Sequence, residues 1–160
     1  MAVSKKSAKN ISKVLSEALP YIQKFSGKTI VIKYGGSAMS NTYLRKSFAR
    51  DIVLMKTVGI NPIIVHGGGP QIEKELKKKN IKSSFLNGVR ITSPEIINTV
   101  QKVLDNQVNK EIVNLINSWG GKAQALAGKR IKFIKAKKIS NKRLGEVGEI
   151  VNIQKKITLN

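Results

Sequence analysis

The sequence contains no cysteine, one histidine and only 9 acidic residues among 160. Without cysteine the chain cannot form disulfides, bind metal through thiolates or use a thiol as a nucleophile. The carboxylates are scattered, and no pair stands at ligand spacing near the glycine-rich segments, so no protein-built metal site is predicted. No apolar run approaches the ~18 residues that a membrane span requires, so we expect no transmembrane helix.

The scarcity of acids leaves 30 basic residues and a formal charge of +21. Such a charge is typical of proteins that bind nucleic acids. However, 25 of these residues are Lys and five are Arg, they are scattered, and only 5% of the chain is aromatic. Base recognition favours Arg and stacking aromatics, and A/T-rich codons explain much of a Lys excess, so we expect no nucleic-acid partner.

The first half of the chain alternates strand and helix patterns. Apolar spacing predicts a helix from Ile11 to Phe25, which Pro20 should kink or split. Further elements are predicted as a strand at 29–34, a helix at 42–58, a strand at 62–66 and a helix at 71–79. Both strands are β-branched and end on glycine, which predicts an α/β fold. Its mostly parallel central sheet would be flanked by helices, with strands buried on both faces.

The second half predicts fewer strands. Residues 83–90 are expected to be extended, with a hairpin-like turn at Asn87-Gly88. A hydroxyl cap followed by Pro94 predicts the start of a long helix that ends near Trp119. Strand-like runs follow at 131–136 and 149–153. The length suits one domain.

Two glycine-rich turns follow the predicted parallel strands, where ligands bind in open α/β sheets. Glycine lets phosphate oxygens approach backbone N–H groups. Neither a Walker A loop nor a G-x-G-x-x-G fingerprint is present, so a phosphate site would be of another design. Lys33 precedes Gly35 inside an apolar strand, where a lysine is costly, so it is a candidate for charge stabilisation. The alternative is an ordinary solvated lysine.

Two further side chains are candidates. His66 follows the second strand, but no carboxylate is placed to hold it, so we favour a role in orienting loop backbone over general-base catalysis. Arg90 has apolar neighbours in the chain, and its planar fork suits a carboxylate; the alternative is a surface arginine.

Several segments together resemble the acetylglutamate kinases of the amino-acid kinase family, over nearly the whole chain and in order. They are residues 33–36 (K-Y-G-G), 65–72 (V-H-G-G-G-P-Q-I), 87–92 (N-G-V-R-I-T), 108–110 (V-N-K) and 144–149 (L-G-E-V-G-E). The resemblance implies an amino-acid kinase-like fold. It also implies ATP-dependent phosphorylation of the side-chain carboxylate of N-acetyl-L-glutamate in arginine biosynthesis, with Mg²⁺ accompanying ATP.

The resemblance also implies roles for individual residues. Lys33 would stabilise the transferring phosphoryl group. Gly35 and Gly36 would donate backbone N–H bonds to phosphate oxygens. Gly68 and Gly69 would contact acetylglutamate, and Arg90 would hold its α-carboxylate.

Residues 12–24 resemble the extra N-terminal helix of the arginine-sensitive branch of these kinases. This implies a homo-oligomer (a hexamer in the full-length form), feedback inhibition by L-arginine, and a possible PII signal protein partner. The expected organisation is a basic flexible tail at 1–10, an N-terminal helix at 11–26 and an acetylglutamate-binding lobe at 27–160. The expected compartment is the cytoplasm or the plastid stroma.

Two departures from the family pattern bear on activity. Arg130 stands where many members have Asp. The chain is also much shorter than family members, so we expect a sheet incomplete at the C-terminus, a missing ATP-binding half and little activity alone. The alternatives are a non-catalytic homologue that binds acetylglutamate, arginine or a PII-like protein, and another amino-acid kinase.

Overall fold

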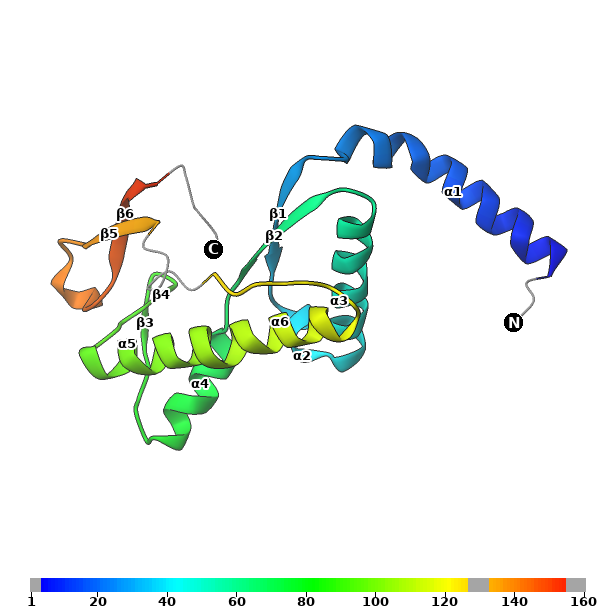
Figure 1. Cartoon of the computed structure of the whole chain (residues 1–160). Coiled ribbons are helices and arrows are strands. Elements are labelled where there is room, and N and C mark those ends of the chain that lie inside the picture. The colour runs from blue at the N-terminus through cyan, green and yellow to red at the C-terminus, as the bar shows by residue number, and fades with distance from the viewer. Residues whose placement is uncertain (1–3, 127–132, 155–160) are drawn as a thin grey trace. The chain divides into compact units, whose positions relative to one another are not determined.

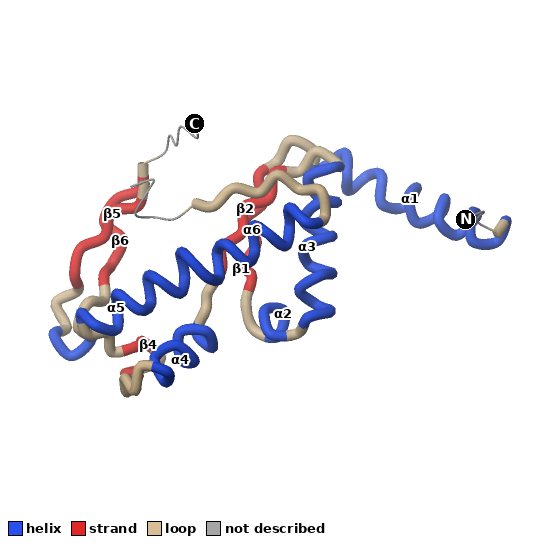
Figure 2. The backbone as a smooth tube through the Cα atoms, turned by 60° about the horizontal axis from the view of Figure 1, so that its bottom comes forward, coloured by secondary structure: helices blue, strands red, loops and turns tan. Residues whose placement is uncertain are grey.

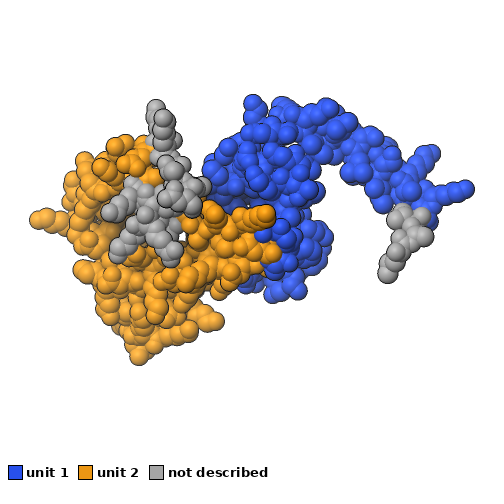
Figure 3. All heavy atoms as spheres, viewed as in Figure 1, with its two compact units in different colours: residues 1–65, 118–121 blue, residues 66–117, 122–160 orange. Residues whose placement is uncertain are grey.

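The structure is a computed structural model that describes residues 4–126 and 133–154. Figure 1 shows the order of its helices and strands. Two compact units are distinguished, one made of residues 1–65 and 118–121 and the other of residues 66–117 and 122–160 (Figure 3). Arg130 and the first two residues of the strand expected at 131–136 lie outside the described residues.

The first unit begins with helix α1, Lys5–Phe25. The helix starts at Lys5 rather than at the predicted Ile11, so it takes in most of the stretch expected to be a flexible tail. The Ser4 side chain explains this start, because it accepts a hydrogen bond from the Ser7 N–H and caps the first turn. Pro20 lies within the helix without dividing it.

The rest of the first unit is a β–α–β arrangement. Strand β1 (Thr29–Tyr34) pairs with strand β2 (Asn61–His66) in a parallel, two-stranded sheet. Helices α2 (Ser37–Ser40) and α3 (Thr42–Thr57) connect them, and α3 runs alongside the sheet (Figures 1 and 2). The predicted strands and the helix at 42–58 are therefore confirmed, while α2 was not predicted.

The core of this unit forms where α3 meets the sheet. The Tyr34 ring stacks on Phe48 with centroids 3.9 Å apart, and Ala49 and Ile52 are buried beside them. Each such burial contributes ~1.5–3 kcal/mol for a large side chain. The Tyr34 hydroxyl donates to the Ala38 carbonyl at 2.9 Å, and burial raises the pKa of this phenol.

The strands are not buried on both faces, so that expectation was wrong. Side chains on one face are exposed, with Val31 at 66% and Val65 at 52%. Lys33 is also exposed and lies on the same face of β1 as Val31, because side chains alternate between the two faces of a strand. Within the described residues α3 covers only the other face, and for this reason a continuous apolar run coexists with an open side.

The second unit packs helix α4 (Gly69–Lys78) on a long helical segment. Ile72 and Leu76 of α4 lie one turn apart and are both buried. The segment comprises α5 (Pro94–Gln101), the π-helix η1 (Lys102–Val108) and α6 (Asn109–Ser118). Ser93 caps α5 by accepting from the Ile96 N–H, as predicted. The π-helical turn in the middle was not predicted, because apolar spacing over one turn does not distinguish the two helix types.

Two antiparallel hairpins complete the second unit. Strands β3 (Phe85–Leu86) and β4 (Val89–Arg90) pair across a turn at Asn87-Gly88, where both residues have positive φ, as the sequence predicted. Strands β5 (Ile134–Lys138) and β6 (Gly148–Ile153) form the other hairpin, with η2 (Lys142–Leu144) in its connection. Backbone bonds from Thr92 to residues 144–146 hold that connection in place.

The fold class is thus α/β, with parallel β1 and β2, as predicted. Among the described residues the other strand pairs are antiparallel. Over the same residues, no helix combines the length and apolar character needed to cross a membrane.

Candidate active site

The first glycine turn lies in the first unit, where β1 ends. Gly36 has φ +60°, a left-handed conformation that glycine adopts more readily than residues with a Cβ. Gly35 has no such requirement, and a Cβ at Gly35 or Gly36 would meet nothing within 4 Å. Packing among the described residues therefore does not explain Gly35, and its backbone is open to the approach of a ligand.

Lys33 precedes this turn with an exposed side chain. The sequence argument that a lysine there is costly to bury was wrong, because the side chain lies on the open face of β1. An exposed ammonium beside two glycines is still suited to an anionic ligand, because a point charge and backbone N–H groups then act together.

The second glycine turn lies in the second unit, between β2 and α4. Gly68 is buried, and a Cβ built on it would lie 2.7 Å from Leu104 Cδ2 and 3.3 Å from Val108 Cγ2. Gly68 is therefore explained by packing against η1. Gly69 is exposed, and a Cβ there would meet nothing within 4 Å.

Gly69 is also the first residue of α4, whose start has no side-chain cap. Pro70 follows, and a proline in the first turn removes one of the N–H groups that lack an intrahelical partner. The remaining N–H groups and the helix dipole favour a negative charge at this end. A carboxylate ligand suits the open side of this turn.

Arg90, on β4, is held by groups that sequence reasoning missed. Its Nη1 donates to Glu73 of α4 and to the Ser83 hydroxyl, and its guanidinium lies 4.6 Å from the Phe85 ring centroid. The hydrogen bond from Arg90 is the main cause that lowers the pKa of the Glu73 carboxyl. No sequence motif linked Glu73 to Arg90, since the ion pair joins a helix to a hairpin.

The Arg90 side chain is only 13% exposed, so it is not the solvated surface arginine of the alternative interpretation. The hydrogen bonds to Glu73 and Ser83 both use Nη1, and a guanidinium carries five N–H donors. Glu73 and Ser83 therefore orient the fork while its other edge remains suited to a ligand carboxylate.

His66 contacts polar groups on both sides of its ring. Nδ1 lies 2.9 Å from the Gly67 carbonyl oxygen, and Nε2 lies 3.1 Å from Nδ2 of Asn109. Neither partner is a carboxylate, which agrees with the predicted role in loop orientation. Sequence reasoning did not single out Asn109, although it belongs to the 108–110 segment that carried the resemblance.

The structure assigns the six predicted site residues to two groups of three. Lys33, Gly35 and Gly36 belong to the first unit. Gly68, Gly69 and Arg90 belong to the second. The two glycines stand at the start of α4, and Arg90 bonds to Glu73 of the same helix. In the described parts of the chain no group of three or more His, Asp and Glu side chains is placed to hold a metal ion.

Comparisons with known proteins identify the family. Residues 28–158 match the family described as "Amino acid kinase family". Acetylglutamate kinase from Marinomonas sp. (strain MWYL1) is 54% identical over 96% of this chain and 55% of the relative. Acetylglutamate kinase from Hahella chejuensis (strain KCTC 2396) is 54% identical over 94% of this chain and 54% of the relative. The chain spans about half the length of these curated relatives.

Solved structures share the fold. The crystal structure of smu.665 from Streptococcus mutans UA159 has a TM-score of 0.71 at 28% identity, over 79% of this chain and 51% of that one. N-acetylglutamate synthase from Neisseria gonorrhoeae, complexed with coenzyme A and N-acetyl-glutamate, has a TM-score of 0.70 at 20% identity, over 87% and 32%. With a family match that covers residues 28–158, the chain belongs to the amino acid kinase family.

Proposed function

We propose that the chain is the acetylglutamate-binding part of an enzyme that transfers a phosphoryl group from ATP to the side-chain carboxylate of N-acetyl-L-glutamate. The observation that carries the proposal is the 54% identity to curated acetylglutamate kinases over almost the whole chain. The two glycine turns and the oriented Arg90 support it, because each offers what an anionic ligand needs.

In the proposed reaction a side-chain carboxylate oxygen forms a bond to the γ-phosphorus of ATP. The bond from that phosphorus to the bridging oxygen breaks, and its electron pair leaves with ADP. Lys33 stabilises the negative charge on the transferring group, and the backbone N–H groups of Gly35 and Gly36 bind phosphate oxygens. Mg²⁺ would supply charge neutralisation when bound with ATP, and the described residues contain no carboxylate cluster that would hold it.

The second unit would bind acetylglutamate. The open side of Gly69 and the uncapped start of α4 suit a carboxylate. Arg90 would pair with the α-carboxylate through the edge of its fork that Glu73 and Ser83 leave open. Gly68 would contact the same ligand through its backbone. Leu104 leaves no room for a side chain at this position.

Binding tests this assignment without requiring turnover. Calorimetry should show that the chain binds N-acetyl-L-glutamate and that Arg90→Lys weakens this binding ~10-fold or more, because a lysine cannot make a bidentate contact. L-glutamate is the matched control ligand, since it keeps both carboxylates but has an α-ammonium group in place of the acetamido group. Equal affinity for both ligands, or an Arg90→Lys variant that binds normally, would contradict the proposal.

The second candidate is a non-catalytic role for the chain taken alone, which spans about half of each curated relative. A module of this kind would bind acetylglutamate, arginine or a PII-like protein without phosphorylating anything. ADP release that depends on N-acetyl-L-glutamate separates the two candidates. Release by this chain alone would favour the enzyme, and binding without release would favour the module.

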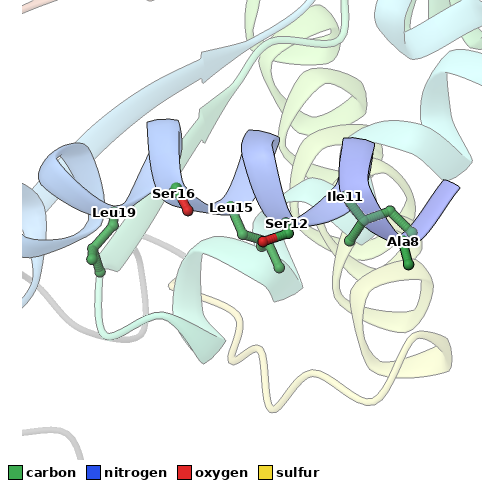
Figure 4. Close-up of a pocket in the computed structure, with 6 residues that line it drawn as sticks. All are labelled: Ala8, Ile11, Ser12, Leu15, Ser16 and Leu19. Carbon is green, nitrogen blue, oxygen red and sulfur yellow. The ribbon is translucent and has the colours of Figure 1, made fainter. Parts of the chain in front are cut away.

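Regulation and assembly are proposed for α1. The helix has no buried residue, and one face forms an apolar groove shown in Figure 4. The groove is lined by Ala8, Ile11, Ser12, Leu15, Ser16 and Leu19. The resemblance of residues 12–24 of α1 to the N-terminal helix of arginine-sensitive kinases supports a homo-oligomer, hexameric in the whole protein, that is inhibited by L-arginine. PII binding and a plastid location belong to the same proposal.

Substitution in the groove tests the role of α1. Leu15→Asp should reduce the oligomer measured by sedimentation, because it places a charge in an apolar contact. Val14→Asp is the matched control, since Val14 is 63% exposed on the same helix and does not line the groove. Equal effects of both variants would contradict assembly through this face, and arginine inhibition that survives removal of residues 1–26 would contradict the regulatory part.

A further inference from the structure

The contacts of His66 determine where its proton lies. The Gly67 carbonyl oxygen lies 2.9 Å from Nδ1, and a carbonyl oxygen can only accept a hydrogen bond. Nδ1 must therefore carry the proton. In the neutral ring Nε2 is then an acceptor, which requires that its partner Asn109 donates through Nδ2.

A second observation agrees with this assignment. Once Nδ2 of Asn109 faces the ring, its Oδ1 points elsewhere, and this oxygen is buried without a hydrogen-bond partner among the described residues. Turning the amide over would offer Oδ1 to Nε2, but a neutral ring protonated at Nδ1 has no hydrogen there to donate. The unpaired Oδ1 is thus a consequence of holding His66 in one tautomer.

The π-helix places Asn109 for this contact. The backbone N–H of Asn109 donates to the Leu104 carbonyl, an i→i−5 bond that closes η1. The same segment supplies Leu104 and Val108, whose side chains pack against Gly68. The same helical segment therefore contacts the glycine turn in two ways. Asn109 reaches the Gly67 carbonyl through His66, and Leu104 and Val108 pack against Gly68. π-Helical turns are frequent at functional sites, because one extra residue redirects a side chain.

We propose that Asn109 is a positioning residue that holds His66 in the Nδ1–H tautomer, so that His66 fixes the Gly67 carbonyl and the backbone N–H groups of Gly68 and Gly69 face the ligand. The ligand part of this inference rests on the proposed acetylglutamate function. The tautomer and its control by Asn109 do not.

The single histidine makes the tautomer directly measurable. Chain labelled with ¹⁵N-histidine gives one imidazole in the nitrogen spectrum. At about pH 9, above the range in which imidazole ordinarily titrates, we expect a protonated Nδ1 and a bare Nε2. A ring protonated at Nε2 in the unsubstituted chain would overturn the proposal, and this measurement needs no variant to fold.

Asn109→Asp sharpens the test, because a carboxylate can only accept and would require a proton on Nε2. We expect Nε2 to become protonated in this variant and the amide signals of Gly68 and Gly69 to move. Asn114→Asp is the matched control, since Asn114 is exposed on α6. An unchanged ring signal in a folded Asn109→Asp chain would overturn the role of Asn109.

Titration with N-acetyl-L-glutamate separates this proposal from the proposed function. If no glycine amide of the turn responds, the ligand assignment fails while the tautomer result stands. If the ligand binds, Asn109→Asp should weaken it ~10-fold, the equivalent of about one net hydrogen bond. Unchanged affinity in an Asn109→Asp chain with an altered ring would overturn the positioning role.

Discussion

A glycine-rich turn follows each of the two parallel strands, β1 and β2, and the surroundings of the two turns differ. At residues 35–36 a side chain would enter open space, and the positive φ of Gly36 is the main constraint. At residues 67–69 the constraint is packing, since Gly68 lies against Leu104 and Val108. The glycines of the two turns are therefore required for different physical reasons, and substitutions at the two turns should have different effects.

The largest expected effect is that of Gly68→Val. The added Cβ would already lie 2.7 Å from Leu104 Cδ2, the two methyl groups would add further volume, and overpacking of this kind costs ~3 kcal/mol. Hydrogen exchange should show lost protection at Ile72 and Val103. Gly35→Val is the control in the other turn and should change protection little, because a Cβ there meets nothing within 4 Å. Equal losses at both positions would remove the distinction between a packed and an open turn.

Gly36→Ala should destabilise the first unit by ~1–2 kcal/mol, because its φ of +60° is strained for a residue with a Cβ. Gly36→Asn should be tolerated better, since Asn visits this region more readily. The midpoint of urea unfolding, followed by the fluorescence of Trp119, measures the difference. An alanine variant as stable as the asparagine variant would show that backbone conformation does not explain this glycine.

Gly69→Ala should leave stability within ~1 kcal/mol, because alanine suits a helical position and no atom stands in its way. Under the proposed function the substitution should still weaken the binding of N-acetyl-L-glutamate, because the new methyl group occupies the open side of the turn. Calorimetry and thermal unfolding on the same sample separate the two effects. Unimpaired binding would mean that the ligand does not use the open side of this turn.

The smallest effect concerns the ion pair that orients Arg90. Arg90 lowers the pKa of Glu73 in the folded chain, so the pair adds stability above the ordinary carboxyl pKa. This contribution is lost as the pH falls through the lowered folded value. Arg90→Ala should therefore show a smaller fall in melting temperature between pH 7 and about pH 3 than the unsubstituted chain. Parallel pH profiles would indicate that the pair does not contribute.

Local elements of both units were predictable from the chain because local interactions decide them. The β-branched run at 29–34, the Asn87-Gly88 turn and the Ser93 cap each depend on neighbours within a few residues. The start of α1 was missed because Ser4 caps it, a signal that lies before the apolar spacing begins.

The predicted site remains a prediction, and the structure adds contacts that the sequence did not indicate. The glycines and Arg90 were named from motifs, whereas Glu73, Ser83 and Asn109 were not. Each of these three reaches its partner from another element, 7 to 43 residues away in the chain. Spacing in the sequence carries no signal for contacts at such separation.

The sequence by itself determined the α/β class, the positions of the two glycine turns and the absence of thiol chemistry, because composition and local periodicity suffice for these. Only the tertiary structure decided which glycine is packed and which is open, that Lys33 is exposed, and which ring nitrogen of His66 carries the proton. These properties depend on what lies across the turn. For Gly68 and His66 the answer is one π-helical segment that ordinary helical periodicity does not reveal.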